Sequence, residues 1–224
     1  MNLISCQSYE QLSTKAASLL DQEIKKIISA KGKAILAIPG GRSVAGLLQK
    51  LSPNDVDWSK VEIFMIDERV VPVEDTESNF KQAHDLFLKK VNVNPHPFLK
   101  EKGVEHYHRE FLRAGAHFDI IVLGAGEDGH IAALFPRHCA LKVEGKKYIQ
   151  FNDSPKPPKE RITASVDMIK DAAVVILLFV SAAKKKAYEQ FLNQKITETK
   201  CPAKIALAAK EIFIFTEFSA EKFL

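Results

Sequence analysis

Apolar residues follow two different patterns along the chain. Some stretches are almost wholly apolar, which is typical of strands buried on both faces of a sheet, and others repeat apolar residues every three or four positions, which is typical of amphipathic helices. The first pattern predicts strands over residues 34–38, 61–66, 118–123, 172–180 and 212–215. The second predicts helices over residues 8–30, 43–51, 79–89 and 183–191, and a short helix from Ser219.

The alternation of strands and helices predicts an α/β fold with a doubly wound, mostly parallel sheet flanked by helices, of the Rossmann-like type. We expect one domain over residues 1–224. The segment 140–161 is the least regular, and we predict a loop there with a short strand at 148–151. Ligands of doubly wound sheets bind beyond the carboxyl ends of the strands, so the residues that follow the predicted strands are the first candidates for a functional site.

Composition narrows the possible environment and partners. The formal net charge of +4 is mild and diffuse, which suits an anionic small molecule but not a nucleic acid. Cys6, Cys139 and Cys201 are far apart, which predicts free thiols in a reducing compartment. No signal peptide is evident, and the longest apolar run is shorter than the roughly 20 residues of a membrane helix. We therefore expect a cytoplasmic protein without nucleic-acid or membrane partners, either a monomer or a homodimer.

The first candidate site is the glycine turn, residues 40–43, which follows a predicted strand and opens a predicted helix. Gly40 and Gly41 allow a ligand to approach the backbone, and the start of a helix offers free N–H groups to an anion. Arg42 and Ser43 add a charge and a hydroxyl. The pattern indicates a phosphate site, and a simple tight turn is the alternative.

The second candidate site follows the strand 61–66. Here Asp67, Glu68 and Arg69 are adjacent, and Ser78 and Asn79 come soon after. Carboxylates in this place can act as bases or orient a hydroxyl, and an arginine can bind a phosphate or carboxylate with two hydrogen bonds. An ion pair at a strand end is the alternative interpretation of this cluster.

The third candidate site follows the strand 118–123, where small residues lead to Asp128, Gly129 and His130. Histidine is the side chain best suited to general base catalysis at neutral pH. A capped turn with a surface histidine is the alternative, but the combination of strand, glycines, acid and histidine favours a functional role for His130.

Together these segments resemble the 6-phosphogluconolactonases, within the glucosamine-6-phosphate isomerase/6-phosphogluconolactonase family. The resemblance spans almost the whole chain, with departures at Val44, Arg137 and Ala182. The matching segments are Gly40-Gly41-Arg42-Ser43, Asp67-Glu68-Arg69 with Ser78-Asn79, Asp128-Gly129-His130 with Leu134-Phe135-Pro136, Pro157-Pro158-Lys159-Glu160-Arg161-Ile162-Thr163, and a lysine after a strand in Val180 to Lys185.

The resemblance implies hydrolysis of 6-phospho-D-glucono-1,5-lactone to 6-phosphogluconate, the second step of the oxidative pentose phosphate pathway. His130 is expected to activate water, while Asp67 and Asp128 contact hydroxyls or tune the site. No cofactor or metal is expected. The residues expected to bind the substrate and its phosphate are Gly40, Gly41, Arg42, Ser43, Arg69, Asn79, Gly129 and Lys185, with Lys185 preferred over Lys184 and Lys186.

Two other functions are compatible with the same resemblance. A glucosamine-6-phosphate isomerase or deaminase of this family has a glutamate five residues after the histidine, where this chain has Phe135. A non-catalytic sugar-phosphate sensor would need a DNA-binding helix pair, and only one helix fits before the strand that begins near Lys33. We therefore favour the lactonase and expect Phe135 to pack on apolar neighbours, anchoring a helix that carries His130. We also expect Gly40, Asp67 and His130 to line one cleft.

Overall fold

The main sheet of the protein is parallel throughout. The structure is a computed structural model in which residues 1–218 are described, so the helix predicted from Ser219 lies outside the described residues. The strands are hydrogen-bonded in the order β1-β10-β9-β6-β2-β3-β5, each pair parallel. Their bounds are β1 Asn2–Ser5, β2 Ala34–Ile38, β3 Val61–Met65, β5 Asn94–His96, β6 Ile120–Gly124, β9 Val174–Phe179 and β10 Glu211–Thr216.

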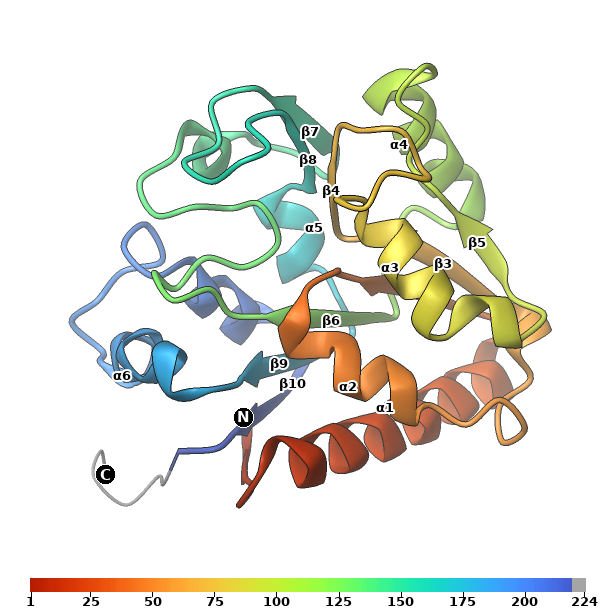
Figure 1. Ribbon diagram of the computed structural model, residues 1–224, viewed down its shortest axis with the longest axis horizontal. Helices are drawn as coiled ribbons and strands as arrows, with labels where there is room; N and C mark the ends of the chain where they lie inside the picture. Colours follow the sequence, from red (N-terminus) through yellow and green to blue (C-terminus); the bar gives the residue numbers. More distant parts are fainter. Residues whose placement is uncertain (219–224) are drawn as a thin grey trace.

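Helices cover both faces of this sheet (Figure 1). One face packs against α1 (Tyr9–Lys31), α2 (Arg42–Lys50) and α3 (Asn79–Leu86), and the other against α4 (Gly103–Ala114), α5 (Val166–Lys170) and α6 (Lys185–Leu192). Alternate residues of β2 join the two layers: Leu36 belongs to the first core and Ala37 to the second. The predicted doubly wound α/β fold is confirmed.

A smaller antiparallel sheet extends from the main one. It has the order β4-β8-β7, with bounds β4 Asp67–Arg69, β7 Tyr148–Phe151 and β8 Arg161–Ala164. Ile66 joins the two sheets, since its N–H donates to Ile38 of β2 and its carbonyl accepts from Ala164 of β8. The polar segment that follows β3 is therefore held as a strand rather than as a loop.

Several elements were not predicted from the sequence: β1, β4, β5, β8, α4 and α5. The first strand is β1 at Asn2–Ser5, so the expectation of a first strand near Lys33 was wrong. The unpredicted strands are short, and β1 and β5 lie at the edges of the main sheet with exposed residues, so none forms a long apolar run. The predicted helix over 79–89 ends at Leu86 and continues after a break as a 3-10 turn, Leu88–Lys90.

The order of the strands defines where a ligand can bind. From β2 the chain proceeds outward to β3 and β5, and it then returns to β6 on the other side of β2. The connections that leave β2 and β6 consequently diverge, which opens a crevice at their carboxyl ends. The glycine turn follows β2 and the segment that leads to His130 follows β6, so the topology brings these two candidate sites together.

Asp119, just before β6, ties α1 to the sheet. Its carboxylate accepts from Lys31 Nζ at 2.5 Å and from the Ile35 N–H at 2.9 Å. Burial opposes ionisation, but the hydrogen bonds from His117, Lys31 and Ile35 outweigh it and lower the pKa of Asp119 to about 2. A carboxyl whose pKa is lowered in the folded protein stabilises the fold at pH values above its ordinary pKa, which is near 3.8. This stabilisation is therefore lost as the pH falls from about 4 towards 2.

We expect Asp119→Asn to lower the free energy of unfolding at neutral pH by about 2 kcal/mol. This value includes only a reduced contribution from the ion pair with Lys31, because solvent screens its half-exposed side chain. Urea unfolding between about pH 7 and about pH 3 should show the difference between variant and wild type narrowing as the pH falls. A difference that stays constant with pH would contradict the assignment to the ionised carboxylate.

Candidate active site

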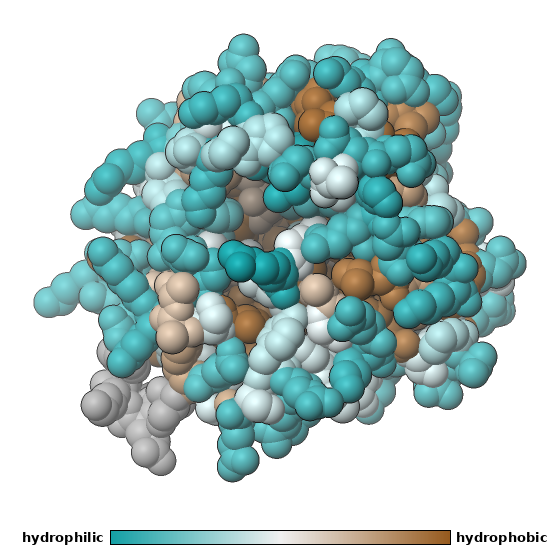
Figure 2. All heavy atoms as spheres, viewed as in Figure 1, coloured by the Kyte–Doolittle hydropathy of each residue, from teal (hydrophilic) through white to brown (hydrophobic). Residues whose placement is uncertain are grey.

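The three candidate segments line one cleft of about 690 Å³ at the carboxyl ends of β2 and β6. The face in Figure 2 is hollowed near its middle and ringed by hydrophilic residues. The prediction that Gly40, Asp67 and His130 share one cleft is confirmed. Five cationic side chains line it, against three carboxylates: Arg42, Arg69, Lys156, Arg161 and Lys184, and Asp67, Glu127 and Glu217. The excess of positive charge suits an anionic ligand.

His130 lies on the histidine turn, residues 126–134, which follows β6. The turn closes on itself, because the Gly126 N–H donates to the His130 carbonyl at 2.8 Å and the Gly129 N–H donates to the Gly126 carbonyl at 3.0 Å. A Cβ on Gly126 would overlap the imidazole ring, so only glycine allows the ring to lie against this backbone. No helix carries His130, contrary to the prediction, since an isolated bridge between Ile131 and Leu134 follows it.

Asp128 orients the His130 ring. The Asp128 Oδ1 atom lies 2.5 Å from His130 Nδ1. Although burial opposes it, the hydrogen bond with His130 lowers the pKa of the Asp128 carboxyl well below its usual range. An ionised Asp128 can only accept, so Nδ1 carries the proton of the neutral ring and Nε2 is left with a lone pair. Among residues 1–218, Nε2 has no hydrogen-bond partner.

Phe135 packs directly on His130. The two ring centroids are 4.8 Å apart, and Phe135 is buried while still lining the cleft. The ring centroid of a second histidine, His138, lies 6.4 Å from that of Phe135. The ring thus contacts the proposed base itself, rather than anchoring a helix as predicted, and it offers His130 no proton donor or acceptor.

Asn79 contacts Asp67 directly and also binds a buried acid, Glu68. Asn79 Nδ2 donates to the Asp67 carbonyl at 2.9 Å, and Glu68 accepts from the Asn79 and Phe80 N–H groups at the start of α3. Burial raises the pKa of Glu68 to about 7, against the opposing effect of these bonds. Burial likewise raises the pKa of Asp67, although Arg69 and Arg161 oppose it. Glu68 holds the start of α3 without lining the cleft itself, whereas Asp67 lines the cleft.

Two arginines lie opposite each other on neighbouring strands of the small sheet. Arg69 of β4 and Arg161 of β8 are directly paired in the antiparallel register, and both line the cleft. Burial, and then the neighbouring Arg69 charge, lower the pKa of the Arg161 guanidinium. Like charges placed opposite each other destabilise a sheet, so this pair favours an anion in the cleft.

The glycine turn presents the start of α2 to the cleft. Gly41 precedes the first helical residue, no side chain of residues 1–218 caps this helix, and Gly40, Gly41, Arg42 and Ser43 all line the cleft. The Gly41 N–H donates to Gln82 Oε1 of α3 at 2.5 Å, which fixes the turn.

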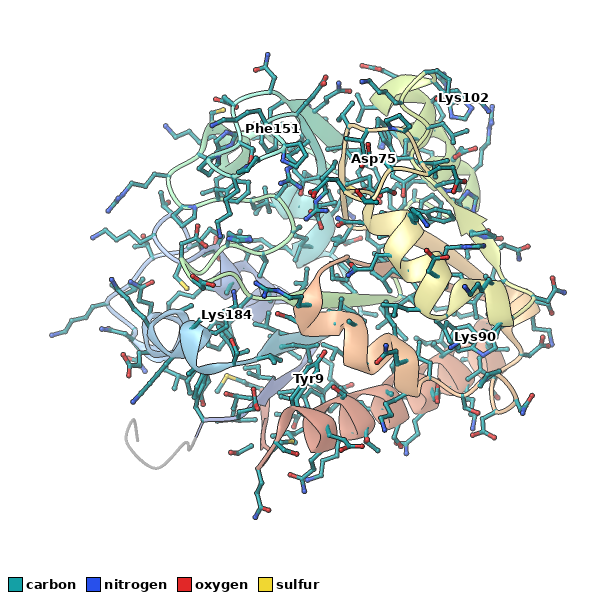
Figure 3. All side chains as sticks on the ribbon, in the orientation of Figure 1. Tyr9, Asp75, Lys90, Lys102, Phe151 and Lys184 are labelled. Atoms are coloured by element: carbon teal, nitrogen blue, oxygen red, sulfur yellow. The ribbon has the colours of Figure 1, made fainter. Side chains whose placement is uncertain are left out.

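Two of the predicted binding residues lie elsewhere. Gly129 does not line the cleft, because it faces Cys201 and its carbonyl accepts from the Ala203 N–H. Lys185 is exposed and also lies outside the cleft lining, whereas Lys184 lines the cleft near Glu127, at 3.6 Å (Figure 3). A 3-10 turn over Ala182–Lys184 precedes α6 and sets which lysine faces inward, and helical spacing could not reveal this turn.

Other cleft residues were missed by sequence reasoning. Arg161 belongs to the Pro-Pro-x-x-Arg segment, so a signal for it existed in the chain. Lys156 comes from the irregular segment 140–161 and reaches within 4.0 Å of Asp128. Tyr9 begins α1, far from every motif. Nothing in the sequence marks Lys156 or Tyr9, because only the folded chain brings them to the cleft.

A further group of polar side chains lies outside the cleft. His138, Cys139 and Asp153 could each offer an atom to a metal ion, whereas the sequence showed no ligand cluster because Asp153 is distant along the chain. Both nitrogens of His138 are already engaged, Nδ1 with the Ala140 N–H at 3.2 Å and Nε2 with Asp153 at 2.9 Å. These bonds explain the cluster as a cap for the following 3-10 turn.

Comparisons with known proteins show similarity over most of the chain. Residues 7–214 match the family described as glucosamine-6-phosphate isomerases/6-phosphogluconolactonase. A probable chloroplastic 6-phosphogluconolactonase 4 of Oryza sativa subsp. indica is 32% identical over 85% of this chain and 66% of its own length. The 6-phosphogluconolactonase of Mycobacterium leprae is 32% identical over 77% of this chain and 78% of its own length. The present chain thus spans just under two thirds of the rice protein.

Solved structures show the same fold. A 6-phosphogluconolactonase from Shewanella baltica OS155 superposes with a TM-score of 0.86 at 25% sequence identity, and the match covers 96% of this chain and 97% of that one. Among residues 1–218, no helix is both long enough and apolar enough to cross a membrane. The family match over nearly the whole chain and the similarity in fold agree, and this chain belongs to the glucosamine-6-phosphate isomerase/6-phosphogluconolactonase family.

Proposed function

We propose that the protein hydrolyses 6-phospho-D-glucono-1,5-lactone to 6-phosphogluconate, in the second step of the oxidative pentose phosphate pathway. The observation that carries this proposal is the Asp128–His130 pair, with Nε2 left free, in a cleft where cationic side chains predominate. The names of the rice, Mycobacterium leprae and Shewanella baltica relatives support the same substrate.

The proposed chemistry needs one base and donors for a developing negative charge. His130 Nε2 takes a proton from water as the water oxygen bonds to the lactone carbonyl carbon. The tetrahedral oxyanion is stabilised by the cationic groups of the cleft, among which Arg69 lies two residues from Asp67 in β4. As the bond from that carbon to the ring oxygen breaks, the imidazolium returns its proton to the leaving oxygen, so no net proton is held by the enzyme.

The phosphate is proposed to bind at the start of α2. The Arg42 and Ser43 N–H groups of the glycine turn have no hydrogen-bond partner among residues 1–218 and can donate to an anion there, and the positive end of the helix dipole favours it. Arg161 and Lys184 supply charge from the other walls of the cleft, and Asp67 and Asn79 are suited to the sugar hydroxyls. Binding the phosphate away from the reacting carbon places the ring for attack.

Phe135 distinguishes the lactonase from an isomerase or deaminase. Ring opening followed by proton transfer between carbons needs a further titratable group, and a phenylalanine ring packed on His130 leaves no space for one there. A sensor without activity would have no use for the ordered Asp128–His130 pair. We also propose a cytoplasmic location, which the free thiols Cys6, Cys139 and Cys201 support.

The direct test is an assay on freshly prepared 6-phosphogluconolactone, with glucosamine 6-phosphate tested in parallel. We expect hydrolysis of the lactone well above its spontaneous rate, and no release of ammonia or fructose 6-phosphate. Release of fructose 6-phosphate by the wild-type protein would overturn the proposed function. Binding of both compounds without turnover would favour the sensor.

The lysines at the start of α6 provide a test of the phosphate site. We expect Lys184→Ala to weaken binding of 6-phosphogluconate by about tenfold, since a charge-assisted contact contributes about 1.5–3 kcal/mol before solvent screening. Lys185→Ala and Lys186→Ala serve as controls, because both side chains are exposed and outside the cleft lining. Calorimetric titration of each variant would measure the change, and equal losses in all three would indicate general electrostatics instead.

A further inference from the structure

The hydroxyl of Tyr9 bridges the first turn of α2. It donates to the Arg42 carbonyl at 2.8 Å and accepts from the Gly46 N–H at 2.7 Å. Arg42 and Gly46 are four residues apart, which is the spacing of one backbone hydrogen bond in an α-helix. A side chain from α1, more than thirty residues earlier in the chain, is thereby joined to the helix at its first turn.

Gly46 is what allows the tyrosine to reach this place. A Cβ on Gly46 would lie 2.8 Å from the Tyr9 hydroxyl oxygen and would also overlap Ser13 of α1. Glycine in the middle of a helix is otherwise unfavourable by roughly 0.5–1 kcal/mol relative to alanine. Its presence within a nine-residue helix therefore matches the close approach of α1 and its hydroxyl.

The turn fixed in this way is the one that faces the cleft. Tyr9 itself lines the cleft beside Gly41, Arg42 and Ser43. In Figure 3, Tyr9 is labelled where the start of α1 passes the start of α2. Its hydroxyl donates one hydrogen bond to the backbone of α2 and accepts another from it, so the hydroxyl binds the helix and not a ligand.

We propose that Tyr9 is a positioning residue, which holds the Arg42 and Ser43 N–H groups at the start of α2 in the orientation that an anion requires. The proposal rests on the proposed phosphate site, and it adds a determinant from α1 that touches α2 but not the reacting atoms. Gln82 fixes the same turn from α3 through the Gly41 N–H, so the turn is held from two sides. Loss of the hydroxyl should leave His130 and Asp128 in place, since neither contacts Tyr9 through a hydrogen bond.

The test compares Tyr9→Phe with Tyr188→Phe, which removes a buried hydroxyl that has no hydrogen-bond partner among the described residues. Tyr188 lies on α6 and outside the cleft lining. We expect Tyr9→Phe to weaken the binding of inorganic phosphate and of 6-phosphogluconate about tenfold. KM should rise by a similar factor, while kcat changes less than about threefold. Tyr188→Phe should change none of these values.

Phosphate affinity within about twofold of the wild type in a folded Tyr9→Phe protein would overturn the inference, as would a fall in kcat with KM unchanged. Circular dichroism and the melting temperature establish that the variant is folded. Gln82→Ala, which removes the second hydrogen bond that holds the same turn, should also weaken the binding of phosphate. If the wild type binds phosphate but does not hydrolyse the lactone, the proposed function fails, while the phosphate titrations still decide the role of Tyr9.

Discussion

Replacing His130 with alanine should lower kcat by roughly 10²–10⁴-fold, the usual contribution of a general base. KM should change little, because the group acts in the transition state and the phosphate contacts remain. Steady-state assays on fresh lactone, corrected for spontaneous hydrolysis, would measure both constants. His106→Ala is the matched control, because His106 lies on α4 and outside the cleft lining. Near wild-type kcat in His130→Ala would exclude His130 as the base.

The same assay can separate the base from the residue that orients it. In Asp128→Asn the side chain keeps its shape but can donate to Nδ1, which favours the tautomer with the proton on Nε2. We expect kcat to fall on the order of 10²-fold or more, as is usual when the base is held in the wrong tautomer. A variant with unchanged kcat would show that Nδ1 of His130 does not need the carboxylate.

The central part of the fold could be predicted because its strands are buried on both faces. The runs that predicted β2, β3, β6, β9 and β10 are almost wholly apolar, with Glu62 as the one charged residue inside β3, and the helices between them repeat apolar residues at helical spacing. β4 and β8 escaped prediction for a physical reason. Their residues include Asp67, Arg69 and Arg161, whose polar side chains line the cleft, so the pattern of these strands reflects the site rather than the core.

The site could be predicted where its residues follow strands directly. Parallel strands place their carboxyl ends at one edge, so Gly40 and His130 were expected to meet, and the structure brings them together. The choice between Lys184 and Lys185 depended on a three-residue 3-10 turn, which has no signal in residue spacing. Tyr9 and Lys156 reach the cleft only through tertiary packing, and no pattern along the chain could indicate them.

Replacing Phe135 with glutamate should destabilise the protein by about 3 kcal/mol or more. The side chain is 4% exposed, so the variant loses a buried aromatic ring and forces a carboxylate into the same space. The His130 ring, which contacts Phe135, is already paired with Asp128. Urea unfolding would measure the loss, with Phe135→Leu as the control that keeps an apolar side chain and should lose less.

This variant also tests whether a carboxylate at position 135 is enough for isomerase chemistry. We expect no conversion of glucosamine 6-phosphate by Phe135→Glu at a temperature where the variant remains folded. The position lines the cleft in direct contact with His130, so the new carboxylate would lie against this ring. Proton transfer between carbons requires the acid or base to reach the substrate at hydrogen-bond distance, and a carboxylate drawn to the His130 ring would not be free to do so. Release of fructose 6-phosphate by the variant but not by the wild type would contradict this expectation, and would show that a single residue separates the two activities in this cleft.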